Sequence, residues 1–400
     1  MRIRTFSCAA IACASGLSAA PALADDAPAA PAAAPAPAPI VLGTPAMSGP
    51  LAANTSPAKF DAGPLGEIFV TGAVSGYGQW QDNVAPGDKA GQFDLSNGQV
   101  FVQKTDGIVQ FFAEVGAYSL PDLGVPYIRS GLATNDFYGP FSQGFLKIAP
   151  NNNWSLEIGK LPTLIGAEYT FSFENVNIER GLLWNQENAV NRGVQLNYTS
   201  GPVSAAVSWN DGLYSNKYSW AWGSLTYTFD SANVLSVIGG GNTRRTSVNT
   251  LVTPLYQDNE QIYNVIYTHT TGPWTLEGYL QYTNVPASTA IGTTQSANTT
   301  GAAFYAIYAV PKVAGLSLPV RVEYISSSGN AADGAPNLLY GPGSKAWSIT
   351  LTPTYQKGIF FARAEFAYVA ASSTTPGLAF GPNGSNASQT RGALELGILF

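Results

Sequence analysis

The sequence predicts an all-β fold, a transmembrane antiparallel β-barrel of about 16 strands with short turns at one end and long loops at the other. Three observations lead to this prediction. Apolar and polar residues alternate along many short segments from Gly66 onward. Short and long connections between these segments alternate strictly, and aromatic residues gather at the segment ends.

The composition excludes several classes of protein. The 400-residue chain has 19 Lys and Arg, 25 Asp and Glu, one His and two Cys. A net charge of −6 offers no basic face to nucleic acid, so no nucleic-acid partner is expected. A single histidine and two cysteines cannot supply a clustered metal site, so the sequence predicts no metal and no cofactor.

Residues 1–24 have the pattern of a secretory signal peptide. Arg2 and Arg4 precede an apolar stretch, and small residues before Asp25 mark a cleavage site. Processing as a lipoprotein at Cys13 is an alternative, although the apolar stretch before that residue is short. The pattern therefore predicts secretion across the inner membrane.

The mature chain, residues 25–400, loses two arginines and both cysteines with this leader. It keeps 17 basic and 25 acidic residues, and a net charge of −8 favours cations in any channel that it forms. Residues 25–65 are rich in Ala and Pro and include 13 consecutive Ala or Pro residues at 27–39. Such a segment cannot bury a core, so we expect a disordered spacer, with attachment to peptidoglycan or a periplasmic partner as the alternative.

Residues 66–400 are predicted to form one barrel domain. Period-two alternation puts apolar side chains on one face of each segment, and no apolar run reaches the roughly 18 residues of a membrane-spanning helix. The strands are expected at 67–80, 95–104, 108–118, 141–149, 153–161, 192–199, 203–211, 219–229, 233–241, 261–270, 274–284, 300–310, 316–327, 345–354, 359–369 and 390–400.

The connections fall into two sets, as in outer-membrane barrels, whose periplasmic turns are short and external loops long. An even number of strands closes the barrel and leaves no unpaired edge in lipid. Strands of about ten residues, tilted by about 40°, also match an apolar band about 25 Å tall. The short turns include 105–107, 150–152, 200–202, 271–273 and 356–358, and the long loops include 119–140, 162–191, 242–260, 328–344 and 370–389.

Aromatic residues at both ends of the predicted strands fit the two water boundaries of a membrane, where rings with an apolar body and a polar edge settle. Ordinary core aromatics are the alternative, but these would not cluster at strand ends. The periplasmic set includes Trp154, Trp274 and Phe360, and the external set includes Trp80, Trp209 and Trp222.

The last predicted strand resembles the C-terminal signal that the barrel-assembly machinery of bacterial outer membranes reads. Leu394, Leu396 and Ile398 occupy every second position, and Phe400 supplies the terminal aromatic residue. A second resemblance lies at 159–198, which contains Gly159-Lys160, Gly166-Ala167-Glu168, an Asn-rich loop and Asn191-Arg192-Gly193. This segment is similar to the OmpL-like β-barrel porin family of bacterial outer-membrane porins, which implies a pore and says little about the solute. The family often has Ser-Arg where this chain has Glu179-Arg180, so no role is transferred to that pair.

Strand parity assigns the charged wall of the lumen. A charge that faces lipid near the middle of the bilayer costs about 2–4 kcal/mol for Arg or Lys, so the charged residues are expected to point inward. The arginines would form a positive stripe that faces acidic groups and sets a transverse field; cross-strand pairing that only stiffens the wall is the alternative. The predicted pore-lining residues are Arg321, Glu323, Arg363, Glu365, Arg391, Glu395, Glu114, Lys147, Glu157 and Glu277.

The third long loop, 162–191, is a candidate constriction. It is thirty residues long, and a loop of that length usually serves a function or folds onto something. In general porins the third loop folds into the barrel and narrows it; a loop that stays outside is the alternative. The charged residues of this candidate are Glu168, Glu174, Glu179, Arg180 and Glu187.

These features predict passive diffusion of small hydrophilic solutes or ions across a bacterial outer membrane, without a catalytic group. A plugged structural or adhesive barrel that binds an external partner through its loops is the alternative. A barrel enzyme is disfavoured, since the only histidine, His269, falls next to a periplasmic turn. The expected partners are outer-membrane lipids and lipopolysaccharide, the assembly machinery and the solute; a homotrimer, usual for general porins, stays open.

Overall fold

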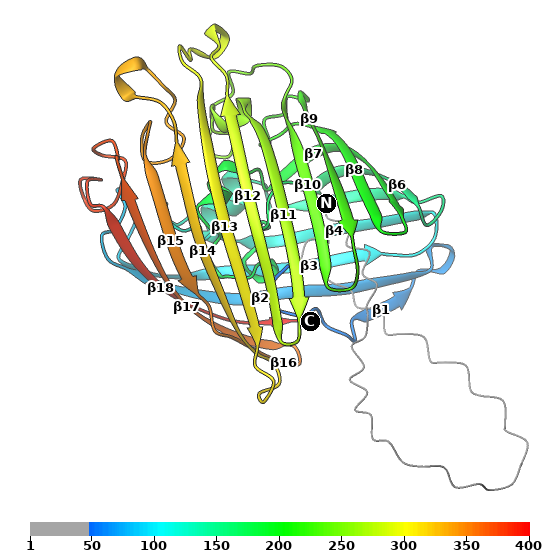
Figure 1. Cartoon of the computed structure of the whole chain (residues 1–400). Helices are drawn as coiled ribbons and strands as arrows, with labels where there is room; N and C mark the ends of the chain where they lie inside the picture. Colours follow the sequence, from blue (N-terminus) through cyan, green and yellow to red (C-terminus); the bar gives the residue numbers. More distant parts are fainter. Residues whose placement is uncertain (1–47) are drawn as a thin grey trace, which may run out of the picture.

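The computed structural model describes residues 48–400 and contains a closed antiparallel barrel whose first and last wall strands, β2 and β18, pair with each other (Figure 1). The predicted signal peptide lies outside the described residues. The wall strands are β2 (Glu67–Gln81), β3 (Gly91–Lys104), β4 (Val109–Tyr118), β5 (Gln143–Ile148), β6 (Trp154–Pro162), β7 (Val190–Ser200), β8 (Val203–Asn210), β9 (Trp220–Thr228), β10 (Asn233–Asn242), β11 (Gln261–Thr271), β12 (Trp274–Val285), β13 (Ala297–Ala309), β14 (Leu316–Ser327), β15 (Lys345–Leu351), β16 (Thr354–Lys357), β17 (Phe360–Ser372) and β18 (Ser388–Leu399).

The strands β15 and β16 together make one crossing of the wall, because both pair with β14 on one side and with β17 on the other. The barrel therefore has 16 transmembrane strands, which confirms the predicted fold. The sequence predicted one unbroken strand at 345–354. Pro353 interrupts it, since proline has no N–H for the ladder, but its carbonyl still accepts from the Ala364 N–H.

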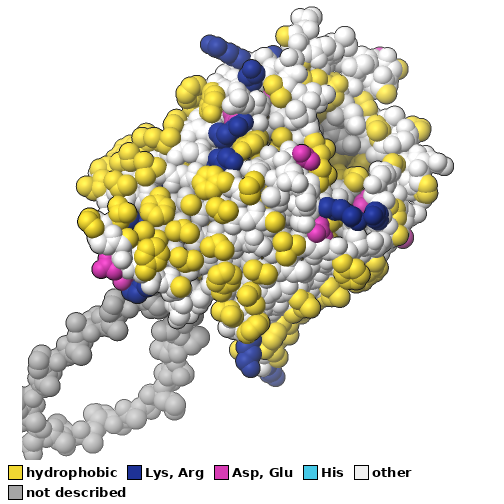
Figure 2. Space-filling view, turned by 180° about the vertical axis from the view of Figure 1, so that it is seen from behind, with side chains coloured by type: hydrophobic (Ala, Val, Ile, Leu, Met, Phe, Trp, Pro, Cys, Tyr) yellow, Lys and Arg dark blue, Asp and Glu magenta, His cyan; other side chains and the backbone are white. Residues whose placement is uncertain are grey.

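The two faces of the wall follow the predicted alternation. On β18, Leu394 and Leu396 are 49% and 64% exposed on the outer face, whereas Arg391 and Glu395 are buried on the inner face. Figure 2 shows hydrophobic side chains gathered over the outside of the barrel. Trp222 departs from the prediction: it points inward and packs with Trp220, so it is not part of the external aromatic boundary.

The connections also follow the predicted order, with the long loops at the upper left of Figure 1 and the short turns at the opposite end. The joint between β4 and β5 holds the only α-helix within residues 48–400, α1 (Ser130–Asp136). None of the helices in this part of the chain is long and apolar enough to span a membrane. Short 3-10 turns are η2 (Ser172–Glu174), η3 (Leu183–Gln186), η4 (Gln257–Asn259), η5 (Thr289–Ile291) and η6 (Ala331–Asp333).

The residues just before the barrel are ordered, although composition assigned them to the spacer. A short strand, β1 (Ala58–Asp61), pairs with the first residues of β2, and the 3-10 turn η1 (Gly63–Leu65) leads into the wall. Ahead of β1, residues 48–52 contact the inside of the barrel. We call residues 48–52 the N-terminal strap.

Candidate pore and its constriction

The joint between β6 and β7, residues 163–189, folds into the barrel, and we call it the inner loop. Every residue of it except Asn185 is buried. It touches inward-facing side chains from several parts of the wall, including Asn97 of β3, Tyr279 of β12 and Glu365 of β17. The candidate constriction predicted at 162–191 therefore lies in the lumen rather than outside the barrel.

The tip of the inner loop is shaped by its own side chains. The Asn175 carboxamide accepts a hydrogen bond from the Tyr169 N–H and donates to the carbonyls of Tyr169 and Phe171. Glu174 accepts from the Phe171 N–H at 2.9 Å and so starts the turn η2. These contacts satisfy backbone groups that a buried loop would otherwise leave unpaired. The tip therefore has a defined shape before the wall contacts are considered.

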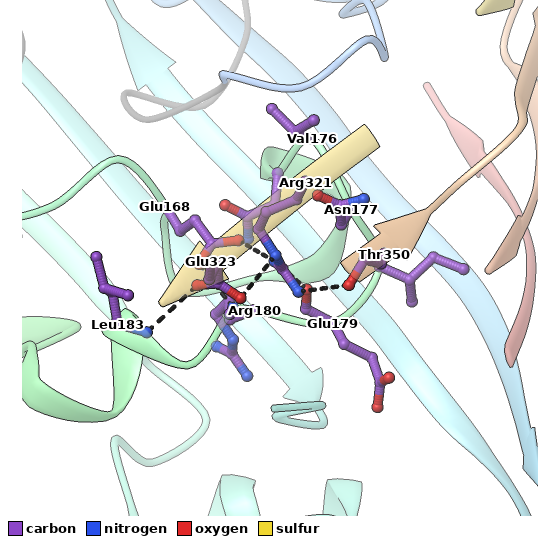
Figure 3. Close-up of polar contacts among 12 residues, drawn as sticks. Glu168, Val176, Asn177, Glu179, Arg180, Leu183, Arg321, Glu323 and Thr350 are labelled. Atoms are coloured by element: carbon purple, nitrogen blue, oxygen red, sulfur yellow. Dashed lines mark hydrogen bonds and ion pairs between the residues drawn. The ribbon is translucent and has the colours of Figure 1, made fainter. Parts of the chain in front are cut away.

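Arg321 of β14 anchors the middle of the inner loop (Figure 3). Its guanidinium donates to the Glu168 carboxylate at 2.5 Å and to the Glu179 carbonyl at 2.8 Å. Glu323, two residues along the same strand, lies 3.1 Å from the guanidinium and accepts from the Leu183 N–H. The Arg321 guanidinium thus contacts one carboxylate of the loop, one carboxylate of the wall and a carbonyl of the loop backbone.

Arg363 of β17 holds the tip. Its guanidinium donates to the backbone carbonyls of Ser172, Asn175 and Val176 at 2.9, 3.0 and 2.9 Å. The Glu395 carboxylate lies 3.5 Å from it on β18 and accepts from the Ser172 hydroxyl at 2.6 Å. Three carbonyls bound by one planar guanidinium fix the tip against the wall with little freedom.

Arg391 of β18 links the inner loop to the joint between β4 and β5. It donates to the Glu179 carboxylate at 2.7 Å and to the carbonyls of Asp122 and Val125. On the neighbouring strand, Glu365 accepts from the N–H groups of Ile178 and Glu179. The three arginines that the sequence placed on a stripe do line one side of the lumen, and each is in contact with the inner loop or its neighbour and at most 1% exposed.

Two further charged residues of the inner loop face the external end. Arg180 pairs with Asp122 at 2.6 Å, donates to the Thr170 carbonyl and lies over the Trp184 ring. Glu187 accepts from the Tyr279 hydroxyl at 2.6 Å and from Gln281 at 2.8 Å. Burial raises the pKa of Glu187 well above its ordinary value, and these two hydrogen bonds oppose the shift only in part.

Glu168 is also perturbed. Burial, together with nearby Glu323, raises the pKa of the Glu168 carboxyl to about 7, against the opposing attraction of Arg321. A carboxyl with such a value changes its charge near neutral pH, so the charge at the centre of the inner loop depends on pH.

The other predicted wall residues lie on β4, β5, β6 and β12. Glu114 of β4 accepts from Gln99 at 2.6 Å and from Ser142 at 2.7 Å. Lys147 of β5 lies 3.6 Å from Glu157 of β6, and Glu277 of β12 accepts from Thr268 at 2.6 Å. All of the predicted pore-lining residues therefore point inward.

Polar atoms without a hydrogen-bond partner occur in several parts of the lumen, among them Gln79 of β2 and Arg363 of β17 as well as a group on β3–β5. Both carboxamide atoms of Gln143, the second oxygen of Glu114 and the side-chain nitrogen of Gln103 have no hydrogen-bond partner among residues 48–400. Buried polar groups are rarely left without partners in a folded protein, unless water supplies them. These residues on β3–β5 therefore form one of the places in the lumen where water fits the chemistry of the wall.

Aromatic rings alternate with this polar set, since Phe101 pairs with Glu114 and Gln103 with Phe112 in the register, and strand parity alone did not identify them. Phe101 stacks on Phe112 at 6.0 Å, Phe112 on Phe145 at 5.8 Å, and Phe173 of the inner loop lies 5.8 Å from Phe101. The rings come from three adjacent strands and the loop tip. They form an apolar layer between the two mouths of the barrel.

Two cavities open toward the two ends of the barrel. The periplasmic cavity measures about 510 Å³ and includes Gln110, Lys147 and Asn197 in its lining. The external cavity measures about 470 Å³ and includes Arg180, Trp184 and Glu187. The two share no lining residue. Across the part of the chain that the structure describes, no group of three His, Cys, Asp or Glu side chains could hold a metal ion.

A closed barrel of this kind, with apolar residues outside, a polar lumen and an inward-folded third loop, has the architecture of an outer-membrane porin. The family model described as "Putative beta-barrel porin-2, OmpL-like" matches residues 67–400, and the chain belongs to that family. The protein is thus a channel of the bacterial outer membrane, embedded in that membrane and passed by solutes, as the resemblance at 159–198 implied.

Solved structures show the same fold at low sequence identity. OmpT of Vibrio cholerae, folded in vitro, aligns with a TM-score of 0.57 at 13% identity over 86% of this chain and 100% of its own. An anion-selective porin from Comamonas acidovorans aligns with a TM-score of 0.56 at 13% identity over 83% of this chain and 99% of its own. No curated protein matches this chain.

Proposed function

We propose that the inner loop is the constriction of this porin and restricts passage to small hydrophilic solutes or ions, which cross by passive diffusion. The observation that carries this proposal is the anchoring of one 27-residue loop inside the lumen by three wall arginines. A loop held at its middle, its tip and its neighbouring joint cannot leave the lumen by bending at one point. Charged groups that surround such a narrowing determine which ions stay in it.

The passage follows the side of the lumen formed by β3–β7. Support comes from the unpaired polar atoms of Gln103, Glu114 and Gln143, which need water, and from Lys147 at the periplasmic cavity. On the other side, the inner loop is bound to the arginines of β14, β17 and β18. A solute from the external side would meet Glu114 and Gln143 at the level of Phe101, and then Gln103 at the level of Phe112 and Phe145.

The proposal includes no catalytic step. His269 lies near the periplasmic end of β11, with its Nδ1 atom 2.8 Å from the side-chain oxygen of Asn233. The barrel-assembly machinery is the proposed reader of the last strand, whose Leu394, Leu396 and Ile398 side chains face outward. Lipopolysaccharide and a homotrimeric assembly complete the proposed partners.

Planar-bilayer recording under a salt gradient tests the proposal. Refolded protein should give discrete conductance steps, and its reversal potential should report cation preference if the mature charge of −8 dominates. A reversal potential of the opposite sign would assign the selectivity to the arginines. A folded barrel that passes no current would overturn the porin function and favour the alternative, a plugged barrel that binds a partner through its external loops.

A further inference from the structure

The N-terminal strap reaches the tip of the inner loop from the periplasmic end. The N–H groups of Ser48 and Gly49 both donate to the Glu174 carbonyl, at 2.7 and 3.0 Å. The Ser48 hydroxyl points to the same carbonyl at 3.3 Å. These contacts join parts of the chain that lie 126 residues apart, and they fall on the turn that Arg363 holds from the wall.

The strap is also fixed to the wall. Leu51 is 4% exposed and belongs to the buried cluster that includes Phe101, Phe361 and Leu399. One residue further, the Ala52 backbone exchanges two hydrogen bonds with the Gln356 carboxamide, at 2.7 and 2.8 Å. A carboxamide that binds both the N–H and the carbonyl of one residue fixes its orientation as well as its position. The strap is thus held at the loop tip, in an apolar site and at the periplasmic rim.

Gly49 shows how closely the strap lies against the loop. A Cβ atom at this position would stand 2.1 Å from the Asn175 carbonyl oxygen and 2.5 Å from the carbonyl carbon. Both are backbone atoms of a turn that is held by Arg363 and by its own side-chain contacts, so neither can move aside easily. Only glycine fits this approach.

From these contacts we propose that the N-terminal strap is the periplasmic half of the constriction: it holds the tip of the inner loop and narrows the inner mouth of the pore. This inference rests on the proposed porin function and adds a second element to the same passage. Leu51 belongs to the same buried cluster as Phe101 of the aromatic layer. Lifting the strap would both free the loop tip and open the periplasmic mouth.

Single-channel conductance of full-length variants tests the restriction. Gly49→Ala should unseat the strap and give a several-fold rise in conductance and a larger cut-off for neutral solutes. Gly278→Ala is the matched control, because that strand glycine on β12 has open space around its missing Cβ. Equal conductance of the Gly49→Ala variant, the Gly278→Ala variant and the parent protein would overturn the proposal.

Thiol labelling shows whether the strap is docked in the barrel, and it does not depend on channel current. Cys8 and Cys13 are first removed with the leader or replaced by serine. The Leu51→Cys variant should then react with a maleimide at least about tenfold more slowly than the Thr55→Cys variant, because Thr55 is exposed. Adding Gly49→Ala should remove this difference. If the two cysteines react at the same rate in the folded parent protein, the strap is not seated and the proposal is wrong, whereas a protected strap in a barrel without current would contradict the porin function alone.

Discussion

The two sides of the lumen use their polar residues in different ways. On β14, β17 and β18, three arginines are buried and bound to the inner loop or the joint beside it. On β3–β5, Gln103, Glu114 and Gln143 keep polar atoms that no described residue pairs. The first side binds the inner loop through charged groups, whereas the second side meets it through the uncharged residues Asn97 and Phe101.

This contrast separates anchoring from conduction. A buried charge is costly unless partners surround it, so the arginines require the loop as much as the loop requires them. An uncharged amide on the other side can exchange water for a passing solute without that cost. We therefore expect substitutions on the arginine side to change the size of the pore, and substitutions on the amide side to change its wetting.

Removing the constriction should have the largest effect. Replacing residues 168–185 of the inner loop by a short Gly-Ser linker should raise single-channel conductance several-fold, because the narrowing and its anchors are lost together. Planar-bilayer recording gives the measurement. Shortening the external loop at 328–344 by a similar replacement is the control, and unchanged conductance after removal of the inner segment would show that the constriction lies elsewhere.

Replacing the three arginines should have the next largest effect. A variant with Arg321, Arg363 and Arg391 changed to alanine should conduct more and shift its reversal potential toward cations, since carboxylates that faced the arginines stay behind. Breaking a buried pair costs roughly 3–5 kcal/mol, so the variant should also unfold at lower denaturant concentration.

Two further variants separate charge from anchoring in that experiment. Lysine at all three positions should raise conductance and leave the reversal potential unchanged, because the charge stays while the contacts to several carbonyls are lost. The double variant Arg244→Ala and Arg245→Ala serves as the control for charge alone. These two arginines lie in the external joint between β10 and β11, away from the inner loop. A reversal potential that does not move in the triple alanine variant would leave only the anchoring role and contradict the predicted transverse field.

A smaller effect is expected on the amide side. Gln143→Leu should lower conductance by making the passage less favourable for water, without changing the tip of the inner loop. Gln261→Leu, at an exposed position on β11, is the matched control. An increase in conductance for Gln143→Leu would mean that solutes do not pass along β3–β7.

The smallest effect is a pH dependence centred on Glu168. Its pKa is raised from 4.5 to about 7, so the seated loop binds this proton more tightly than free chain does. The proton on Glu168 therefore stabilises the seated loop. This stabilisation grows as pH falls from about 7 to 4.5, and it is lost as pH rises through about 7. Conductance should therefore increase from pH 5.5 to 8, and Glu168→Gln should reduce this change; a variant with the full pH response would exclude Glu168 as its source.

The fold could be predicted from local pattern, whereas the contacts in the lumen could not. Alternation of two residues places Arg363 and Glu395 on the inner face without knowledge of any other strand, and the structure confirms the inward direction. The carbonyls that Arg363 binds belong to residues 187–191 positions away, and no periodicity specifies such partners. The aromatic layer was missed for a related reason, since inward Phe112 and Phe145 break the polar side of the alternation.

Composition was a poorer guide than periodicity ahead of the barrel. The Ala- and Pro-rich character of 25–65 predicted a spacer, yet Leu51 is buried and Ala52 binds Gln356. A single leucine between polar and small residues carries no period, so a sequence window cannot reveal it. Gly49 is informative only once the backbone of Asn175 is known to lie against it.

The strand β18 connects completion of the wall with closure of the lumen. One edge of it pairs with β2, its outward leucines form the expected recognition signal, and its inward Arg391 and Glu395 bind the inner loop and its surroundings. A barrel without β18 lacks the pairing that closes the wall, and it also lacks one of the three arginines that bind the inner loop. The twelve residues of this strand therefore serve two purposes at once, because they close the wall against β2 and hold the loop that narrows the lumen.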